Sequence, residues 1–98
     1  ANRMSAPYQA LATADGYLTI GANNQKLWGL LCEVLELPQL REDPRFADNN
    51  SRMANRAELV GALEERLAEA GTDEWVTRLL EAGVPAGPIR DYRYVLEE

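Results

Sequence analysis

Few residues of this sequence could carry chemistry, and their types limit what that chemistry would be. The chain of 98 residues contains no histidine and one cysteine, Cys32. These counts exclude a Ser-His-Asp or Cys-His nucleophile pair, every histidine-containing metal site and a cysteine-rich zinc site within this chain. Any reaction that the chain performs unaided must therefore use a carboxylate, a tyrosine or a lysine.

Four side chains could be functional, and each also has a structural explanation. Asp15-Gly16 could present a carboxylate to a ligand, although this pair is typical of a tight turn. Cys32 could be a nucleophile, but it lies on the apolar face of a predicted helix, where a buried thiol is expected. Trp28 and Trp75 could stack on an adenine, yet both occupy apolar helical positions that favour core packing.

A group of arginines and a proline-rich turn are the remaining candidates for ligand contact. The arginines could bind a phosphate group, although a solvated and partly ion-paired face is the expected use of Arg41, Arg45, Arg52 and Arg56. Residues 83–88 could bring their backbone close to a ligand. This segment lacks the Lys-Ser/Thr ending of a phosphate-binding loop, and a helix stop followed by a rigid turn also explains it.

The composition argues against several classes of partner. A net charge of −6 and a pI near 4.6 disfavour binding to nucleic acid or to an anionic membrane surface. No apolar run of the sequence approaches the length that crosses a bilayer. A lone cysteine cannot form an internal disulfide, so a cytoplasmic location is predicted. The hydrophobic fraction of 46% is that of a globular domain.

Apolar spacing predicts three helices, over residues 25–36, from 51 or 55 to 70, and over 73–82. Asn23 or Asn24 is expected to cap the first helix, and Thr72 is expected to cap the third. The buried face of the third helix would consist of Trp75, Val76, Leu79 and Leu80. Residues 39–50 are predicted to be irregular. The mixture of these helices with short strands predicts an α+β fold.

The predicted strands are short and lie next to residues that favour turns. Asp15-Gly16 predicts a hairpin turn before a strand over residues 17–21, in which Leu18 and Ile20 face one side. Residues 87–90 are predicted to form an edge strand, and Asp91 to begin a final helical turn, 92–96. The expected architecture is about three helices packed on a short antiparallel or mixed sheet, after a tail at residues 1–6.

Three phrases in a fixed order resemble one family, the class III CoA-transferases. The first phrase contains Pro7-Tyr8, Thr13-Ala14-Asp15-Gly16-Tyr17-Leu18, Ile20, Ala22, Asn24, Trp28, Leu31-Cys32 and Leu35. The second contains Asp43-Pro44-Arg45-Phe46, Arg52, Asn55, Leu59 and Leu63. The third contains Thr72, Glu74-Trp75, Leu79, Ala82-Gly83-Val84-Pro85 and Gly87-Pro88-Ile89. Together these phrases cover nearly the whole chain and resemble the small domain of that family (the CaiB/BaiF group).

The resemblance implies that residues 7–98 are the small domain of a longer enzyme. It implies a large Rossmann-like domain outside this chain, which would hold most of the coenzyme A site and an aspartate that forms covalent intermediates. It also implies an interlaced homodimer that acts on an acyl-CoA and a carboxylic acid without a tightly bound cofactor. The family includes formyl-CoA and carnitine CoA-transferases and α-methylacyl-CoA racemases, so an acyl-CoA racemase is an alternative to a transferase.

On this interpretation the chain has no catalytic residue and no metal site of its own, and the fragment alone is expected to be inactive. Tyr8 is the one residue predicted to lie near substrate, because it falls where the chain would enter from the larger domain. A different class of function is also open. The chain could be a stand-alone acidic interaction module that binds a partner helix in an apolar groove around Leu30 and Leu63.

Overall fold

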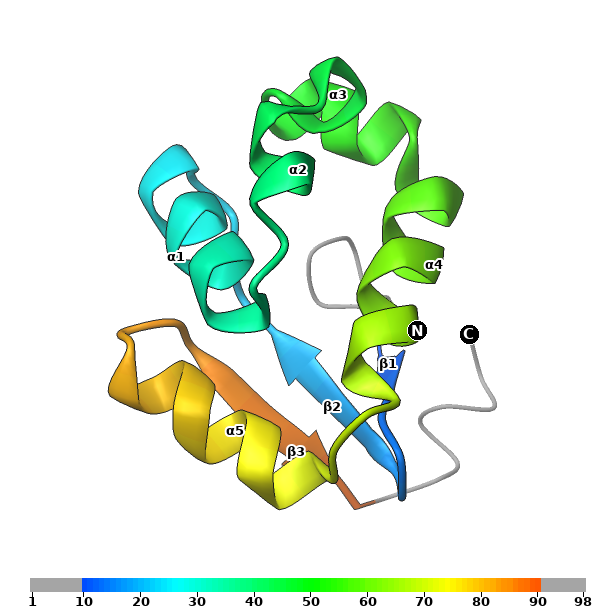
Figure 1. The fold of residues 1–98 in the computed structure, drawn as a ribbon, viewed down its shortest axis with the longest axis vertical. Coiled ribbons are helices and arrows are strands. Elements are labelled where there is room, and N and C mark those ends of the chain that lie inside the picture. The colour runs from blue at the N-terminus through cyan, green and yellow to red at the C-terminus, as the bar shows by residue number, and fades with distance from the viewer. Residues whose placement is uncertain (1–9, 91–98) are drawn as a thin grey trace.

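The computed structural model describes residues 10–90, which form five α-helices, one 3-10 turn and a three-stranded sheet. In chain order the elements are β1 (Leu11–Ala12), β2 (Tyr17–Ile20), α1 (Gln25–Leu35), α2 (Pro38–Glu42), η1 (Pro44–Phe46), α3 (Asn49–Ala54), α4 (Arg56–Leu67), α5 (Thr72–Glu81) and β3 (Ala86–Ile89). Helices α1 to α4 curve around one end of the sheet, and α5 packs beside β2 and β3 (Figure 1). The predicted α+β fold is confirmed.

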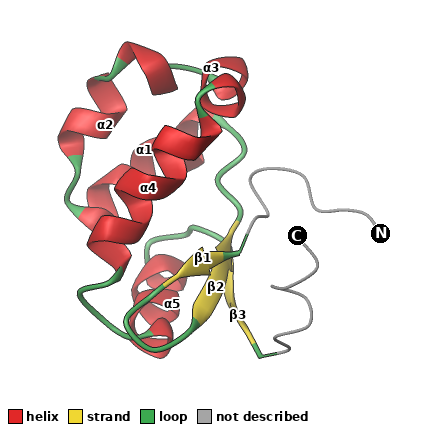
Figure 2. Cartoon of the chain, turned by 90° about the vertical axis from the view of Figure 1, so that its right-hand side faces the viewer, coloured by secondary structure: helices red, strands yellow, loops and turns green. Residues whose placement is uncertain are grey.

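The sheet is antiparallel throughout and has the order β1-β2-β3. Leu18 pairs with Leu11 on one side and with Pro88 on the other. Leu18 and Ile20 are buried, whereas their neighbours Tyr17 and Thr19 are half-buried, as the alternation of a strand requires. Pro88 lies on the edge strand, where a missing N–H costs no ladder hydrogen bond. Figure 2 shows α5 on one face of this sheet.

The long helices follow from their apolar spacing. In α1 the buried side is formed by Trp28, Leu31, Cys32 and Leu35, and the helix begins where the Asn24 side chain accepts a hydrogen bond from Leu27 N at 2.8 Å. In α5, Trp75 and Leu79 are buried. The prediction that Leu80 is buried is wrong, because this side chain is 53% exposed.

The stretch between α1 and α4 was predicted incorrectly. Residues 39–50 contain most of α2, the 3-10 turn η1 and the start of α3. Helix α1 ends where Glu36 adopts the left-handed conformation, with φ 59°. Pro38 then starts α2, because proline is tolerated at the first position of a helix. Asp43 and Asp48 each cap the following turn by accepting a backbone N–H, from Arg45 at 2.9 Å and from Ser51 at 2.8 Å. Local side-chain caps therefore stabilise elements too short to show a periodic pattern.

The predicted helix from 51 or 55 to 70 is two helices. Asn55 has non-helical torsion angles, φ −113° and ψ 36°, and it separates α3 from α4. Its side-chain Nδ2 donates to Arg45 O and to Ser51 O, both at 3.0 Å. An asparagine that bonds to nearby carbonyls in this way competes with the helical ladder. Helix α4 then ends at Leu67, three residues before the predicted end.

Gly83 follows α5 with φ +94°, a left-handed conformation that glycine adopts readily at the end of a helix. Val84 N then donates to Leu79 O at 2.9 Å, and Gly21 N donates to Pro85 O at 2.8 Å. These bonds hold the turn against β2, so the helix stop and rigid turn are confirmed. The predicted final turn from Asp91 lies outside the described residues.

Candidate functional site

An apolar groove opens between the sheet and helices α1, α3 and α4. Its cavity volume is about 70 Å³. Most of its lining is apolar and comes from five elements and the β2–α1 loop: Leu11, Ile20, Ala22, Trp28, Leu31, Met53, Leu59, Val60 and Leu63. Asn49, Arg52 and Arg56 supply the polar lining. The lining, apolar with a few polar groups, resembles that of a binding site, but a volume of 70 Å³ is well below the roughly 300–1,000 Å³ of a ligand pocket.

The groove corresponds in part to the surface predicted for an interaction module. Leu63 of α4 lines it, as predicted. From α1, however, the lining residues are Trp28 and Leu31, whereas Leu30 is half-buried elsewhere on the helix. Successive helical residues point about 100° apart, so a shift of one residue moves the side chain to another face.

Arg52 lies at the groove and contradicts the prediction of a solvated arginine. Its side chain is buried, with 5% exposure, and Nη1 donates to Phe46 O at 3.0 Å. The guanidinium carbon lies 4.8 Å from the centroid of the Trp28 ring. Trp28 in turn meets Phe46 edge to face, with ring centroids 6.4 Å apart. Arg52 is therefore the polar centre of an aromatic cluster, an arrangement that favours a planar cation.

Two donors in this cluster have no hydrogen-bond partner among the described residues. They are Nη2 of Arg52 and Nε1 of Trp28, and both residues line the groove. Burial lowers the pKa of Arg52, and the nearby Asp48 carboxylate opposes that shift. Both nitrogen atoms are themselves almost completely buried, so these donors are unpaired inside the aromatic cluster and are not open to a molecule in the groove.

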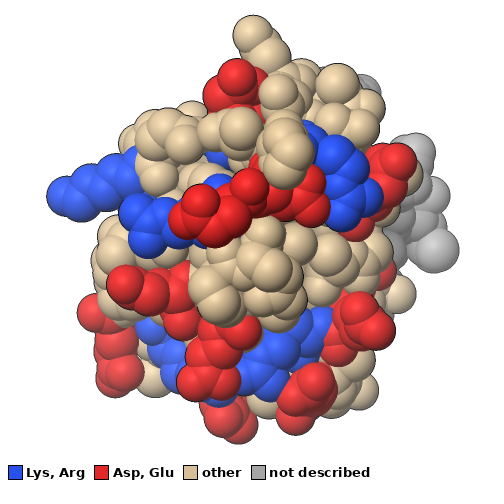
Figure 3. Space-filling view, turned by 45° about the horizontal axis from the view of Figure 1, so that its top comes forward, with Lys and Arg blue, Asp and Glu red and all other residues tan. Residues whose placement is uncertain are grey.

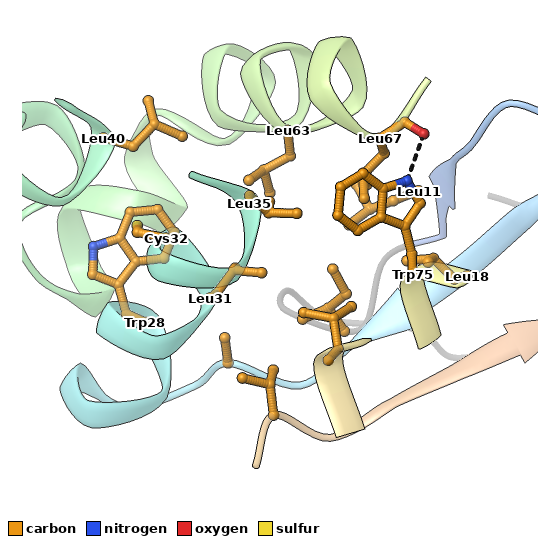
Figure 4. Packing of buried hydrophobic residues seen from close by; sticks show 14 of the residues in the cluster. Leu11, Leu18, Trp28, Leu31, Cys32, Leu35, Leu40, Leu63, Leu67 and Trp75 are labelled. Atoms are coloured by element: carbon orange, nitrogen blue, oxygen red, sulfur yellow. Dashed lines mark hydrogen bonds between the residues drawn. The ribbon is translucent and has the colours of Figure 1, made fainter. Parts of the chain in front are cut away.

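Cys32 is a buried structural thiol, as predicted. It is free, 2% exposed, and lies beside Trp28 in the core (Figure 4). Burial raises the pKa of the Cys32 thiol to about 11, and the charges of Arg41 and Arg52 offset only part of that rise. A neutral, inaccessible thiol is a poor nucleophile.

Both tryptophans pack in the core, as predicted. Trp28 is 2% exposed and Trp75 is fully buried. Trp75 Nε1 donates to Leu67 O at 2.9 Å, the bond drawn in Figure 4. The guanidinium carbons of Arg66 and Arg78 lie 5.3 and 4.5 Å from the Trp75 ring centroid. The ring is enclosed by its own chain and is not available to stack on a base.

The other arginines of the group fit the expected charged surface. Arg45 is about half-exposed and pairs with Asp43 at 2.8 Å. Arg41 lies across α1, where a Cβ added to Gly29 would come within 3.1 Å of its guanidinium carbon. Over the face drawn in Figure 3, acidic and basic side chains alternate without a continuous basic patch. That face does not have the charge distribution of a nucleic-acid surface.

Asp15 forms the predicted turn and also has a role that the sequence did not reveal. Its carboxylate accepts a hydrogen bond from Thr72 N at 2.9 Å, at the first turn of α5. Thr13 Oγ1 and Thr72 Oγ1 lie 2.7 Å apart in the same contact. Gly71 permits this approach, since a Cβ there would lie 2.9 Å from a carboxylate oxygen. The cap of α5 therefore comes from the hairpin, 57 residues earlier in the chain, and not from Thr72 as predicted.

Replacing Asp15 by asparagine is expected to make the stability of the domain less dependent on acid pH. The hydrogen bond from Thr72 N holds the pKa of the Asp15 carboxyl below its ordinary value of 3.8. A carboxyl with a lowered pKa in the folded state stabilises the fold above pH 4 and loses that contribution as the pH falls through its folded pKa. Asparagine keeps an acceptor oxygen but has no charge. Urea unfolding of both proteins between pH 2 and pH 7 should show a difference that is largest near neutral pH and disappears in acid. A difference that does not change with pH would contradict this account.

Tyr8, the predicted substrate-proximal residue, lies outside the described residues. Within residues 10–90, no group of three or more cysteine, aspartate or glutamate side chains is placed to hold a metal ion. The same part of the chain has no helix that is both long and apolar enough to span a bilayer.

Comparison with known proteins identifies relatives along the whole chain. The sequence model of CoA-transferase family III matches residues 1–98. The succinyl-CoA:glutarate CoA-transferases of Mus musculus and Homo sapiens are 42% and 39% identical to the chain over 92 residues, which are 94% of the chain and 21% of each relative. The crystal structure of a CAIB/BAIF family protein from Brucella suis has a TM-score of 0.83 and 42% identity, over 95% of this chain and 25% of that one. The chain thus spans about a fifth of the curated relatives and a quarter of this structure.

Proposed function

Because the chain belongs to CoA-transferase family III, we propose that it is the small domain of a longer enzyme that moves coenzyme A from an acyl-CoA to a carboxylic acid. The observation that carries this proposal is the match over the whole chain to relatives named as CoA-transferases. Besides the mouse and human proteins, the acetyl-CoA:oxalate CoA-transferase of Acetobacter aceti is 38% identical over 88% of the chain. None of these names is a racemase, which favours the transferase of the two enzymes expected from the sequence.

The covalent step is proposed to use an aspartate outside these 98 residues. That carboxylate would attack the acyl-CoA thioester and form a mixed anhydride with release of the coenzyme A thiolate. The thiolate would then attack the aspartyl carbonyl, release the donor acid and leave an aspartyl-CoA thioester. The acceptor carboxylate would displace the thiolate to form a second anhydride, and attack of the thiolate on the acceptor's carbonyl would give the new acyl-CoA and free the aspartate. Two reactive side chains among the described residues are not available as nucleophiles, which supports this assignment. The Cys32 thiol is buried and protonated, and the Asp15 carboxylate is engaged at the start of α5. The chain alone is therefore expected to be inactive.

The small domain would exclude water from the reacting thioester and shape the space for the acyl group. Tyr8 is proposed to lie at that boundary, where the chain enters from the larger domain. The whole enzyme is proposed to be a cytoplasmic homodimer with a Rossmann-like large domain, and to use acyl-CoA as a substrate without a tightly bound cofactor.

The test is the activity of the whole gene product. We expect it to be several times larger than this chain, and to transfer CoA from succinyl-CoA to glutarate or to another small carboxylic acid. Hydroxylamine should trap the acylated aspartate, and mass spectrometry should locate it outside residues 1–98. Epimerisation of a 2-methylacyl-CoA without CoA exchange would show a racemase instead. A native product no larger than this chain would leave the interaction module as the better account.

A further inference from the structure

We propose that residues 38–54, the segment that comprises α2, η1 and α3, open from α1 as one unit while the rest of the domain stays folded. This segment, called the flap below, lies at the end of the domain away from the sheet (Figure 1). The opening does not depend on the proposed function, and its test measures no CoA transfer.

The first observation is the distribution of hydrogen bonds. Among the described residues, every hydrogen bond and ion pair of the flap runs within the flap or to the residues at its two ends, Leu37 and Asn55. The long side chain of Arg52, for example, donates from Nη1 to Phe46 O inside the same segment. Detaching the flap therefore breaks no hydrogen bond to the helices and strands outside it.

The second observation is the backbone at the two ends of the flap. Glu36 has φ 59° and ψ 44°, a left-handed conformation that is uncommon for residues other than glycine. Leu37 has φ −122° and ψ 64°, and Asn55 has φ −113° and ψ 36°, so neither is helical. Hinges consist of a few residues between elements that absorb changes in torsion angles. Residues 36–37 and 55 therefore have the position and backbone of two hinges.

The third observation is the contact that holds the flap closed. It consists of side-chain packing, in which the Phe46 ring meets Trp28 of α1 edge to face and the Arg52 guanidinium lies over the Trp28 ring. Closure also buries two donors that have no partner among the described residues, Nη2 of Arg52 and Nε1 of Trp28. A buried unpaired donor is costly, and water would pair both donors once the flap opens. The closed position thus carries a cost that lowers the free energy of opening.

Opening of the flap would enlarge the apolar groove. Asn49, Arg52 and Met53 of the flap form one part of the groove lining, and the rest comes from the sheet, the β2–α1 loop, α1 and α4. The groove of the closed domain, with a volume of about 70 Å³, is smaller than a ligand pocket. Because one wall belongs to the flap, the volume of the groove depends on the position of the flap.

Cys32 provides a reporter of the opening. The thiol is 2% exposed and lies beside Trp28 (Figure 4). The charges of Arg41 in α2 and of Arg52 in α3 both act on it, so the flap lies over this side of α1. A covered thiol reacts with an alkylating reagent only when it becomes exposed and ionised. The rate of alkylation therefore measures how often the cover opens.

Alkylation of Cys32 in the whole native protein tests the proposal. The protein is treated with excess iodoacetamide at a series of urea concentrations below the unfolding transition, and mass spectrometry follows the peptide that contains Cys32. Opening of the flap alone exposes little surface, so the alkylation rate should change little with urea and exceed the rate expected from global unfolding at least about tenfold. A rate that follows global unfolding at every urea concentration would overturn the proposal.

A matched pair of variants separates opening of the flap from a general loss of stability. Phe46→Leu and Leu79→Val each reduce a fully buried side chain, Phe46 in the flap and Leu79 in α5. Phe46→Leu should raise the rate of Cys32 alkylation without urea about five- to tenfold, because it weakens the contact with Trp28. Leu79→Val should lower the urea midpoint but leave that rate within about twofold. Equal effects of the two variants, or a larger effect of Leu79→Val, would reject the flap.

Discussion

Replacing Trp75 by alanine should unfold the domain at moderate temperature or reduce its stability by about 3–5 kcal/mol, the cost of removing a large aromatic side chain from a core. Trp75 is fully buried between α4 and the sheet, and its Nε1 donates to Leu67 O. Folded domains are stable by about 5–15 kcal/mol, so this loss is a large part of the total. Urea unfolding followed by circular dichroism measures it, and Trp28 remains as a fluorescent probe.

Two further substitutions show which contact of Trp75 is responsible. Trp75→Phe keeps most of the apolar contact but removes the bond to Leu67 O, which retains only the longer bond from Ala70 N at 3.3 Å, and should cost about 1–2 kcal/mol. Leu80→Ala on the same helix should change stability by less than about 0.5 kcal/mol, because Leu80 is 53% exposed. If Trp75→Ala is no more destabilising than Leu80→Ala, the core arrangement around Trp75 is wrong.

The parts of the fold that were predictable are those with a repeated physical signal. The spacing of Trp28, Leu31, Cys32 and Leu35 defines a buried helical face, and that face is buried in the structure. Leu18 and Ile20 alternate with half-buried neighbours in β2 as a strand requires. In each case several residues report the same periodicity, so one ambiguous position does not change the result.

The short helices were not predictable in this way because single contacts define them. Helix α2 has five residues and α3 has six, which is less than two turns. The ends of α3 depend on the side chains of Asp48 and Asn55, and α2 has no side-chain cap at its start. Aspartate and asparagine are equally typical of an irregular loop. The sequence indicates that the chain turns there, but the periodic pattern is too short to identify a helix.

The groove and its donors depend on contacts between residues distant in the sequence. Leu11, Trp28 and Leu63 come from a strand and two different helices, and only the folded chain brings them to one groove. The cap of α5 by Asp15 also joins residues distant in the sequence, and no local pattern around Thr72 indicates it. Arg52 was misassigned since an arginine in a charged stretch is usually exposed, whereas here the aromatic cluster of Trp28 and Phe46 encloses it.

Arg52 should therefore contribute far more to stability than an exposed arginine with a similar aromatic contact. Arg52 and Arg45 each place the guanidinium carbon 4.8 Å from a ring centroid, Arg52 over Trp28 and Arg45 over Phe46. Arg45→Ala should cost less than about 1 kcal/mol, because that side chain is half-exposed and its ion pair with Asp43 is solvated. Arg52→Ala should cost about 3 kcal/mol, since it removes a charged hydrogen bond to Phe46 O and leaves a hole beside Trp28.

Two further substitutions of Arg52 separate the effect of filling the buried space from the effect of the charge. Arg52→Met fills the space without a buried charge and should restore part of the stability lost in Arg52→Ala, because an apolar side chain of similar size often replaces a buried ion at little cost. Arg52→Lys keeps the charge, but its ammonium cannot lie flat over the Trp28 ring while donating to Phe46 O. The unmodified protein should have the highest urea midpoint, Arg52→Met and Arg52→Lys intermediate midpoints, and Arg52→Ala the lowest. Equal losses for Arg45→Ala and Arg52→Ala would mean that the aromatic contact alone, and not the enclosure of Arg52, stabilises this end of the domain.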